Sequence, residues 1–249
     1  KENIERMRAM NKITQPKACI MGAELRRKKL PESSKIISED LAYILGVCYG
    51  DGCISVSQRR VILSVTDEDF ASKFKETIER WSGFKTSTSI RKPNKLYKMH
   101  KLQYWTHIDS KEAADFLDKV DINLLLDYNS KIRSALLRGF YDSEGSVKKG
   151  DSYKRMGIGG YNTNLELINL VRKLLVSFNI YTTQYFRKET FKSGKQITKR
   201  YYIIFINRRE SIINFYNHVG FNIKRKQERL EKQVKLIKGV DKNDNRQQR

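Results

Sequence analysis

Two periods of hydrophobic residues occur along the chain, and together they predict a repeated order of helices and strands. Apolar residues three or four apart, such as Phe70, Phe74 and Ile78, predict helices, whereas alternating apolar and polar residues predict strands. After Ser38, which we interpret as a helix N-cap, the pattern predicts a helix, two strands, a helix, two strands and a helix, at residues 41–50, 53–57, 61–66, 68–81, 86–92, 101–108 and 111–119.

The same order of elements is predicted again in the second half of the chain. The segments are a helix, two strands, a helix, two strands and a helix, at residues 131–142, 146–149, 155–160, 164–178, 182–188, 199–207 and 209–218. A further basic helix is expected at 224–238. A duplicated unit of this kind predicts two similar halves. We therefore divide the chain into a basic N-terminal extension (1–38), a first half (39–127), a second half (128–238) and a polar tail that we expect to be disordered (239–249).

The charge of the chain narrows the choice of partner. Fifty Lys and Arg residues against 28 Asp and Glu residues give a formal charge of +22, which indicates a polyanionic partner such as nucleic acid. The apolar runs are about ten residues long, short of the roughly 20 needed to cross a bilayer, so no membrane partner is expected.

Three cysteines without a CxxC pair favour neither a disulfide framework nor a zinc site. No signal peptide is visible, and an intracellular location (cytoplasm, nucleoid or organelle matrix) is the expectation.

Two acids follow predicted helices in a way that suggests shared chemistry. Asp51 is the second-last residue of the segment LAYILGVCYGDG (41–52), and Glu144 lies near the end of ALLRGFYDSEGS (135–146). A helix C-terminus carries partial negative charge, so an acid there is unfavourable unless a cation compensates it. Each helix also carries small residues four apart, which allow two helices to pack closely; these are Gly46, Gly50, Gly139 and Ser143.

If the two helices pair through these small residues, Asp51 and Glu144 emerge side by side. Two adjacent carboxylates are suited to a hard divalent cation such as Mg²⁺, which completes its shell with water and phosphate oxygens. An Asp-Gly pair after a single helix is more often a simple turn. Two copies, each leading into the same unit, favour the metal site.

The two segments resemble the motifs of the LAGLIDADG homing endonucleases, in the form that carries both motifs in one chain. The resemblance implies an α+β fold of two pseudo-symmetric αββαββα halves, with saddle-shaped antiparallel sheets and the motif helices paired at their interface. It implies that Asp51 and Glu144 bind Mg²⁺ or Mn²⁺, and that the carbonyl groups of Gly50 and Ser143 add ligands. The implied activity is metal-dependent cleavage of both strands of double-stranded DNA at a long site, by a monomer associated with intron homing.

The family also places a basic or polar side chain near each metal, and here the match is weaker. Lys131 follows the first acid by 80 residues (131 − 51) and Lys226 follows the second by 82 (226 − 144). We interpret this pair as candidate catalytic cations. The competing interpretation is that both are solvated helix lysines.

Recognition of the DNA sequence is expected from the strands, because β-ribbons fit the major groove. The connections at 90–101 and 186–200 are interpreted as flexible basic arms. Candidate contacts, of which a part would reach phosphate rather than bases, are Arg59, Arg60, Arg91, Lys92, Lys101, Gln103, Lys148, Lys149, Arg155, Arg187, Lys188, Lys199 and Arg200.

Two alternatives use the same fold without DNA cleavage. One is a maturase that binds intron RNA, and the other is a DNA-binding regulator that has lost the chemistry. Acids at both motifs favour the nuclease, whereas the weak match at the basic positions favours the binders. Dependence on a divalent metal distinguishes them, because cleavage requires the metal and binding does not.

Overall fold

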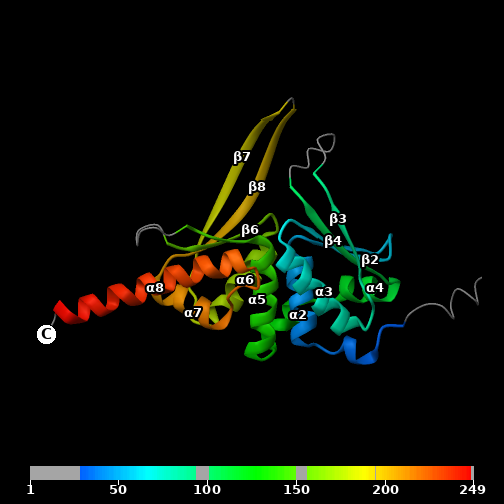
Figure 1. Ribbon diagram of the computed structural model, residues 1–249, viewed down its shortest axis with the longest axis horizontal. Helices are drawn as coiled ribbons and strands as arrows, with labels where there is room; N and C mark the ends of the chain where they lie inside the picture. The colour runs from blue at the N-terminus through cyan, green and yellow to red at the C-terminus, as the bar shows by residue number, and fades with distance from the viewer. Residues whose placement is uncertain (1–28, 94–100, 150–155, 194, 248–249) are drawn as a thin grey trace, which may run out of the picture.

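The computed structural model describes residues 29–93, 101–149, 156–193 and 195–247. The predicted α+β fold of two similar halves is confirmed (Figure 1). The first half consists of η1 (Glu32–Lys35), α2 (Glu39–Cys48), β1 (Gly52–Ser55), β2 (Arg60–Val65), α3 (Glu68–Ser82), β3 (Ser87–Arg91), β4 (Gln103–Asp109), α4 (Lys111–Lys119) and η2 (Ile122–Asp127). The second consists of α5 (Ser130–Glu144), β5 (Gly145–Val147), β6 (Ile158–Asn162), α6 (Leu165–Val176), β7 (Thr183–Ser193), β8 (Lys195–Ile206), α7 (Arg209–His218) and α8 (Lys224–Gln247).

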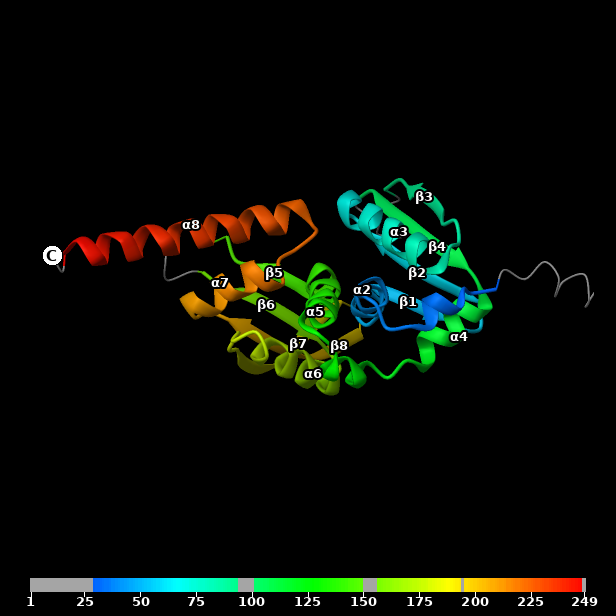
Figure 2. The same ribbon diagram turned by 90° about the horizontal axis from the view of Figure 1, so that it is seen from below.

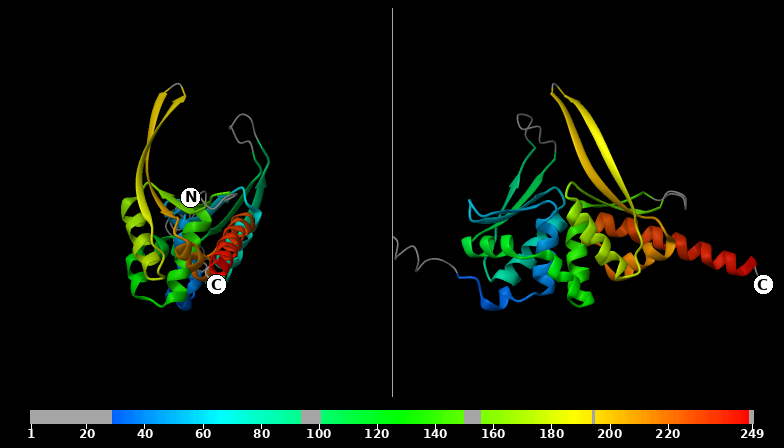
Figure 3. Two further views of the ribbon diagram at one scale, coloured as in Figure 1. Left: turned by 90° about the vertical axis from the view of Figure 1, so that its left-hand side faces the viewer. Right: turned by 180° about the vertical axis from the view of Figure 1, so that it is seen from behind.

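Each half contains a four-stranded antiparallel sheet with helices on one face. The strand orders are β1-β2-β4-β3 and β5-β6-β8-β7, so the two sheets have the same topology. Figure 2 views the molecule from the helical side, where α3 and α6 lie over the two sheets. The hairpins β3–β4 and β7–β8 rise on the opposite side, as the two views of Figure 3 show. The helix-free faces of both sheets therefore look in the same direction.

Local sequence explains where the two motif helices begin. The Ser38 hydroxyl accepts a hydrogen bond from the Leu41 N–H (3.2 Å) at the start of α2. The Asn129 side chain accepts one from the Ile132 N–H (3.1 Å) at the start of α5. Both contacts satisfy N–H groups that have no partner within their helix. Residues 41–47 are all buried, which explains why α2 is apolar around its whole circumference rather than along one stripe.

The two motif helices pack in parallel with their backbones in contact. A Cβ atom added to Gly46 would lie 2.3 Å from the Leu136 carbonyl oxygen, and one added to Gly139 would lie 2.3 Å from the Tyr43 carbonyl oxygen. One turn further on, a Cβ atom at Gly50 would lie 2.4 Å from the Ser143 Cβ. Because the contacts proceed in the same direction along both helices, their C-termini meet.

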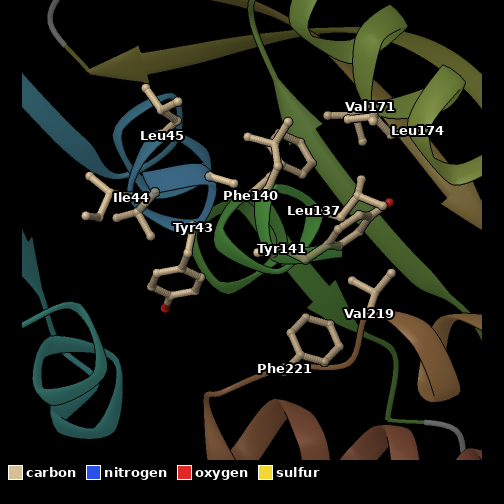
Figure 4. Close-up of a cluster of buried hydrophobic side chains, with 14 of the residues drawn as sticks. Tyr43, Ile44, Leu45, Leu137, Phe140, Tyr141, Val171, Leu174, Val219 and Phe221 are labelled. Carbon is tan, nitrogen blue, oxygen red and sulfur yellow. The ribbon is translucent and has the colours of Figure 1, made fainter. Parts of the chain in front are cut away.

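The core of the molecule is continuous across this helix pair. Figure 4 shows side chains of α2 and α5 packed with those of α6 and of the segment between α7 and α8. Tyr141 of α5 is central to the second half, because its ring contacts Phe215 (centroids 4.7 Å apart) and Phe221 (6.3 Å). The paired helices therefore carry side chains that belong to both hydrophobic cores.

Three details differ from the sequence prediction or fall outside the described residues. The segment 186–200 was expected to be a flexible arm, but β7 and β8 pair as far as Ser193 and Lys195. Charged side chains can be solvated on both faces of a two-stranded ribbon, so high charge does not exclude a strand. The tail at 239–249 was expected to be disordered, but α8 continues to Gln247 because extending a formed helix costs little. Most of the arm at 90–101 and of the extension at 1–38 lies outside the described residues.

The last part of the N-terminal extension packs on the first half. The Leu30 side chain is 2% exposed, and the Trp81 indole N–H donates a hydrogen bond to the Ser34 carbonyl (2.8 Å). Residues 29–38 therefore act as a brace on α3. No helix within the described ranges has the length and apolar character needed to cross a membrane.

The glycine contact gives a test of the helix pairing. We expect Gly139→Ala to lower the free energy of unfolding by about 2–3 kcal/mol or more, because its methyl group would meet backbone atoms of α2 that cannot move aside. Gly239→Ala in α8, where a Cβ meets no atom within 4 Å, is the matched control. That change should stabilise the protein by about 0.5–1 kcal/mol. Urea denaturation of both variants measures these changes, and an unaltered Gly139→Ala variant would contradict the packing.

Candidate active site at the ends of the paired helices

Asp51 and Glu144 lie together where the C-termini of α2 and α5 reach the junction of the two sheets (Figure 1). A Cβ atom at Gly50, directly before Asp51, would lie 3.1 Å from the Glu144 Cγ. Partial burial, and then the nearby Asp51 carboxylate, raise the pKa of Glu144 to about 7. The pKa of Asp51 is also raised, because partial burial removes part of the hydration of its carboxylate. The two acids therefore form one site with excess negative charge.

Asn162 at the end of β6 orients Glu144. Its Nδ2 donates hydrogen bonds to the Glu144 Oε1 (3.2 Å) and to the Tyr49 carbonyl (3.3 Å), so one side chain links the ends of both motif helices. Sequence reasoning did not find Asn162. The register of the two sheets places Val65 at the equivalent position of the first half, so the duplication contained no signal for it.

Lys226 in the first turn of α8 compensates the charge at this site. Its Nζ is buried and donates hydrogen bonds to the carbonyls of Tyr141 (3.0 Å), Asp142 (2.6 Å) and Ser143 (3.5 Å), the last carbonyls of α5. A cation at this place is favoured by the helix dipole. Burial lowers the pKa of Lys226 to about 8, against the opposing effect of the nearby carboxylates.

The buried carboxylate of Asp142 joins the two halves. It accepts hydrogen bonds from the Tyr43 hydroxyl of α2 (2.9 Å) and from the N–H (2.9 Å) and Nδ2 (2.8 Å) of Asn222. Its side chain is 1% exposed, and burial raises its pKa. These contacts hold α2, α5 and the segment before α8 in one arrangement.

The start of α8 also reaches the first half. The Arg225 guanidinium donates two hydrogen bonds to the Asp67 carboxylate (2.6 and 2.7 Å), and the Lys224 N–H donates one to Asp69 (2.6 Å) at the start of α3. Residues 222–226 therefore contact both halves and the ends of the paired helices. This segment has no equivalent in the duplicated unit.

The structure does not bring Lys131 to the acids. It is exposed in the first turn of α5, whereas Glu144 is the last residue of the same helix. At a rise of about 1.5 Å per residue, the two are roughly 20 Å apart along the axis. The spacing was misleading because α5 follows the first half as a motif helix, whereas α8 follows the second half as an added helix.

The oxygen atoms at the junction of the two helices are suitable ligands for a divalent cation. Two carboxylates, with the helix-end carbonyls of Gly50 and Ser143 beside them, are hard oxygen ligands. Across the described parts of the chain, no group of three or more His, Cys, Asp or Glu residues converges on one point. A cation held by Asp51 and Glu144 would therefore take further ligands from water and phosphate, as Mg²⁺ commonly does. The raised pKa of Glu144 also indicates a carboxylate that a cation would stabilise.

The candidate DNA contacts lie on or around the helix-free faces. Arg91 and Gln103 are cross-strand neighbours at the end of the first sheet, and Arg60 forms an ion pair with Asp109 on the same face. Arg155 lies outside the described residues, and the backbone of Lys199 in β8 pairs with that of Glu189 in β7. Exposed side chains at the edges of the two sheets are those of Arg59, Lys92, Lys101, Lys148, Lys149, Arg187, Lys188 and Arg200.

Comparison with known proteins agrees with this geometry. Residues 131–220 match the LAGLIDADG-like domain. The uncharacterized protein MJ0314 of Methanocaldococcus jannaschii is 36% identical over 168 residues, which cover 63% of this chain and 61% of that protein. MJ0398 of the same organism is 29% identical over 218 residues, or 82% and 74% of the two chains. The chain thus spans less than two thirds of the length of MJ0314.

Two solved structures share the fold. A variant of the homing endonuclease I-DmoI superposes with a TM-score of 0.52 and 18% identity, over 76% of this chain and 91% of the other. Full-length DUF199/WhiA from Thermatoga maritima superposes with a TM-score of 0.54 and 17% identity, over 87% and 69%. The second half of this chain therefore matches a LAGLIDADG-like domain, and the duplicated fold with its paired motif helices is the fold of these two solved structures.

Proposed function

We propose that this protein is a site-specific endonuclease that cleaves both strands of DNA with Mg²⁺ or Mn²⁺, as a monomer with one half for each half-site. The observation that carries the proposal is the pair of acids, Asp51 and Glu144, at the meeting C-termini of two helices. The charge of +22 supports a polyanionic substrate. I-DmoI, which shares the fold, has been crystallised in complex with DNA and Ca and with DNA and Mn.

The residues of the site have distinct parts in this proposal. Asp51 and Glu144 would hold the cation, which, when bound, lowers the pKa of an attacking water and stabilises the leaving oxygen. Asn162 keeps the Glu144 carboxylate in place, and Lys226 stabilises the negative end of α5. The exposed lysine and arginine side chains at the sheet edges would bind the phosphates on either side.

A second candidate function is DNA binding without cleavage. The observation that favours it is the asymmetry of the site. Lys226 of α8 hydrogen-bonds the end carbonyls of α5, whereas the Tyr49 carbonyl at the end of α2 accepts a hydrogen bond from the neutral side chain of Asn162.

Cleavage of a plasmid library with randomised sites, followed by sequencing of the ends, separates these functions. A recurrent long site cut on both strands with Mg²⁺ and left intact with EDTA is the expected result. Salt-sensitive binding without any cut would favour the regulator, and preference for intron RNA would favour the maturase.

The acids give the first prediction from this proposal. Asp51→Asn and Glu144→Gln should each abolish double-strand cleavage, because each removes a charged ligand of the metal. Binding to the same DNA in Ca²⁺ should remain within a few-fold of the wild type, as measured by gel shift. Glu166→Gln on the exposed first turn of α6 is the matched control and should cut normally. Full activity of either site variant would refute the metal assignment.

The raised pKa of Glu144 gives a prediction about stability. Between pH 4.5 and about 7 the folded protein holds more protons on Glu144 than the unfolded chain, so metal-free stability should fall as pH rises through this window. Glu144→Gln removes this titration. Its free energy of unfolding relative to the wild type should therefore increase from pH 5 to pH 8, by about 1–2 kcal/mol after allowance for solvent screening.

Chemical denaturation at several pH values, with and without Mg²⁺, measures this effect. Millimolar Mg²⁺ should restore the stability of the wild type at pH 8 and leave Glu144→Gln unchanged. Glu166→Gln should show no such trend. A pH-independent difference between wild type and Glu144→Gln would contradict the raised pKa of Glu144.

A further inference from the structure

The helix-free faces of the two sheets carry different chemistry at equivalent positions. Equivalent positions in the two sheets follow from the strand register. In the first sheet, Gly52 of β1 aligns across β2 with Thr106 of β4. In the second sheet, Gly145 of β5 aligns across β6 with Ile204 of β8, so Thr106 and Ile204 are equivalent. Thr106 and Ile204 are both buried towards the helices. Their neighbours therefore point to the helix-free side, and the equivalent pairs there are Gln103 with Tyr201, Trp105 with Ile203, His107 with Phe205, and Ser89 with Tyr185.

The face of the first sheet is polar and already organised. The Arg91 guanidinium lies 3.8 Å from the centre of the Trp105 ring, which keeps its N–H groups in a fixed plane. The Trp105 indole N–H donates to the His107 Nδ1 (3.1 Å), and the His107 Nε2 lies 3.5 Å from the Asp109 carboxylate. Arg91 also pairs across the strands with Gln103. Arginine matches the major-groove edge of guanine and glutamine that of adenine, so this face suits purines.

The face of the second sheet is apolar and aromatic. Ile203 and Phe205 are half-buried in its centre, and the Tyr185 side chain is 51% exposed beside them. Tyr161 lies over Gly159, where an added Cβ would be 2.9 Å from the tyrosine ring. The Lys148 Nζ lies 4.2 Å from the centre of the Phe205 ring. An accessible apolar face of this kind in a strongly basic protein indicates a surface that binds a specific ligand.

The position of this face limits what can cover it. It flanks the Asp51–Glu144 site on one side, as the polar face flanks it on the other, and both look in the same direction. A duplex placed across the site would lie over both faces, with exposed Lys148, Lys149 and Arg187 at the edge of the second. The apolar group that duplex DNA presents in its major groove is the thymine C5-methyl, which apolar side chains contact.

We propose, on the basis of the proposed function, that the second sheet reads thymine methyl groups through Tyr185, Ile203 and Phe205. The half-site under the second sheet is accordingly A·T-rich, whereas the half-site under the first sheet contains purines contacted by Arg91 and Gln103. The protein distinguishes the two ends of its site by methyl contacts at one end and hydrogen bonds at the other.

Deoxyuridine substitution tests this assignment directly, because it removes the thymine methyl and leaves base pairing unchanged. Duplexes selected from a random library in Ca²⁺ are prepared with deoxyuridine in place of thymine in one half-site at a time. We expect wild-type affinity to fall about fourfold for each contacted methyl in one half-site. The other half-site should tolerate the substitution.

Two adjacent residues of β7 provide a matched pair of variants. Tyr185 pairs with Ile203 on the helix-free face, whereas Phe186, which is 57% exposed, pairs with Tyr202 and points the other way. Tyr185→Thr should weaken binding and reduce the deoxyuridine penalty in the sensitive half-site, which identifies that half-site as the one under the second sheet. Phe186→Thr should retain both the affinity and the penalty.

The outcomes separate this inference from the proposed function. Sequence-specific binding without a methyl effect, or an equal penalty in Phe186→Thr and Tyr185→Thr, would overturn the methyl assignment and leave the nuclease proposal standing. Absence of salt-sensitive DNA binding would overturn both. Concentration-dependent self-association lost in Tyr185→Thr would instead assign the apolar face to a second copy of the chain and overturn the inference.

Discussion

The backbone contact between α2 and α5 is the constraint on which the rest of the structure depends. At Gly46 and Gly139 the two backbones are so close that no side chain fits between the helices. The separation and register of the helices are therefore fixed by backbone atoms that cannot rearrange. Because the helices are parallel, the same contact brings Asp51 and Glu144 together. It also sets the relation of the two sheets, since each sheet follows directly from a motif helix through β1 or β5. One close contact therefore determines both the site and the spacing of the two faces.

Negative charge accumulates where the two helices meet, and nearby basic residues balance it. Two helix C-termini and two carboxylates accumulate negative charge, and the Asp142 carboxylate is buried nearby. Two basic residues at the start of α8 compensate this charge. Lys226 hydrogen-bonds the end carbonyls of α5, and Arg225 hydrogen-bonds the Asp67 carboxylate. A buried lysine without such partners would lose its charge. The compensation therefore comes from outside the duplicated unit, and it makes the two halves of the site unequal.

This inequality extends to the sheets. The duplicated strands keep the same register, yet Trp105 and His107 are replaced by Ile203 and Phe205 at equivalent positions. Core positions such as Thr106 and Ile204 remain buried in both halves. The two halves thus share their strand register and buried positions, whereas the surfaces that face the proposed ligand differ. Such divergence suits a substrate whose two ends differ.

The sequence by itself determined the order of the elements, the duplication, the small residues of the helix pair and the two acids. Each of these follows from local periods, caps and spacings along the chain. The tertiary structure alone decided that Lys226 reaches the site and Lys131 does not, and that Asn162 and Asp142 join the two halves through Tyr49 and Tyr43. It also decided that the segment 186–200 forms a paired ribbon. The physical reason is that these contacts join residues many positions apart, and their partners are chosen by packing, which no local pattern records.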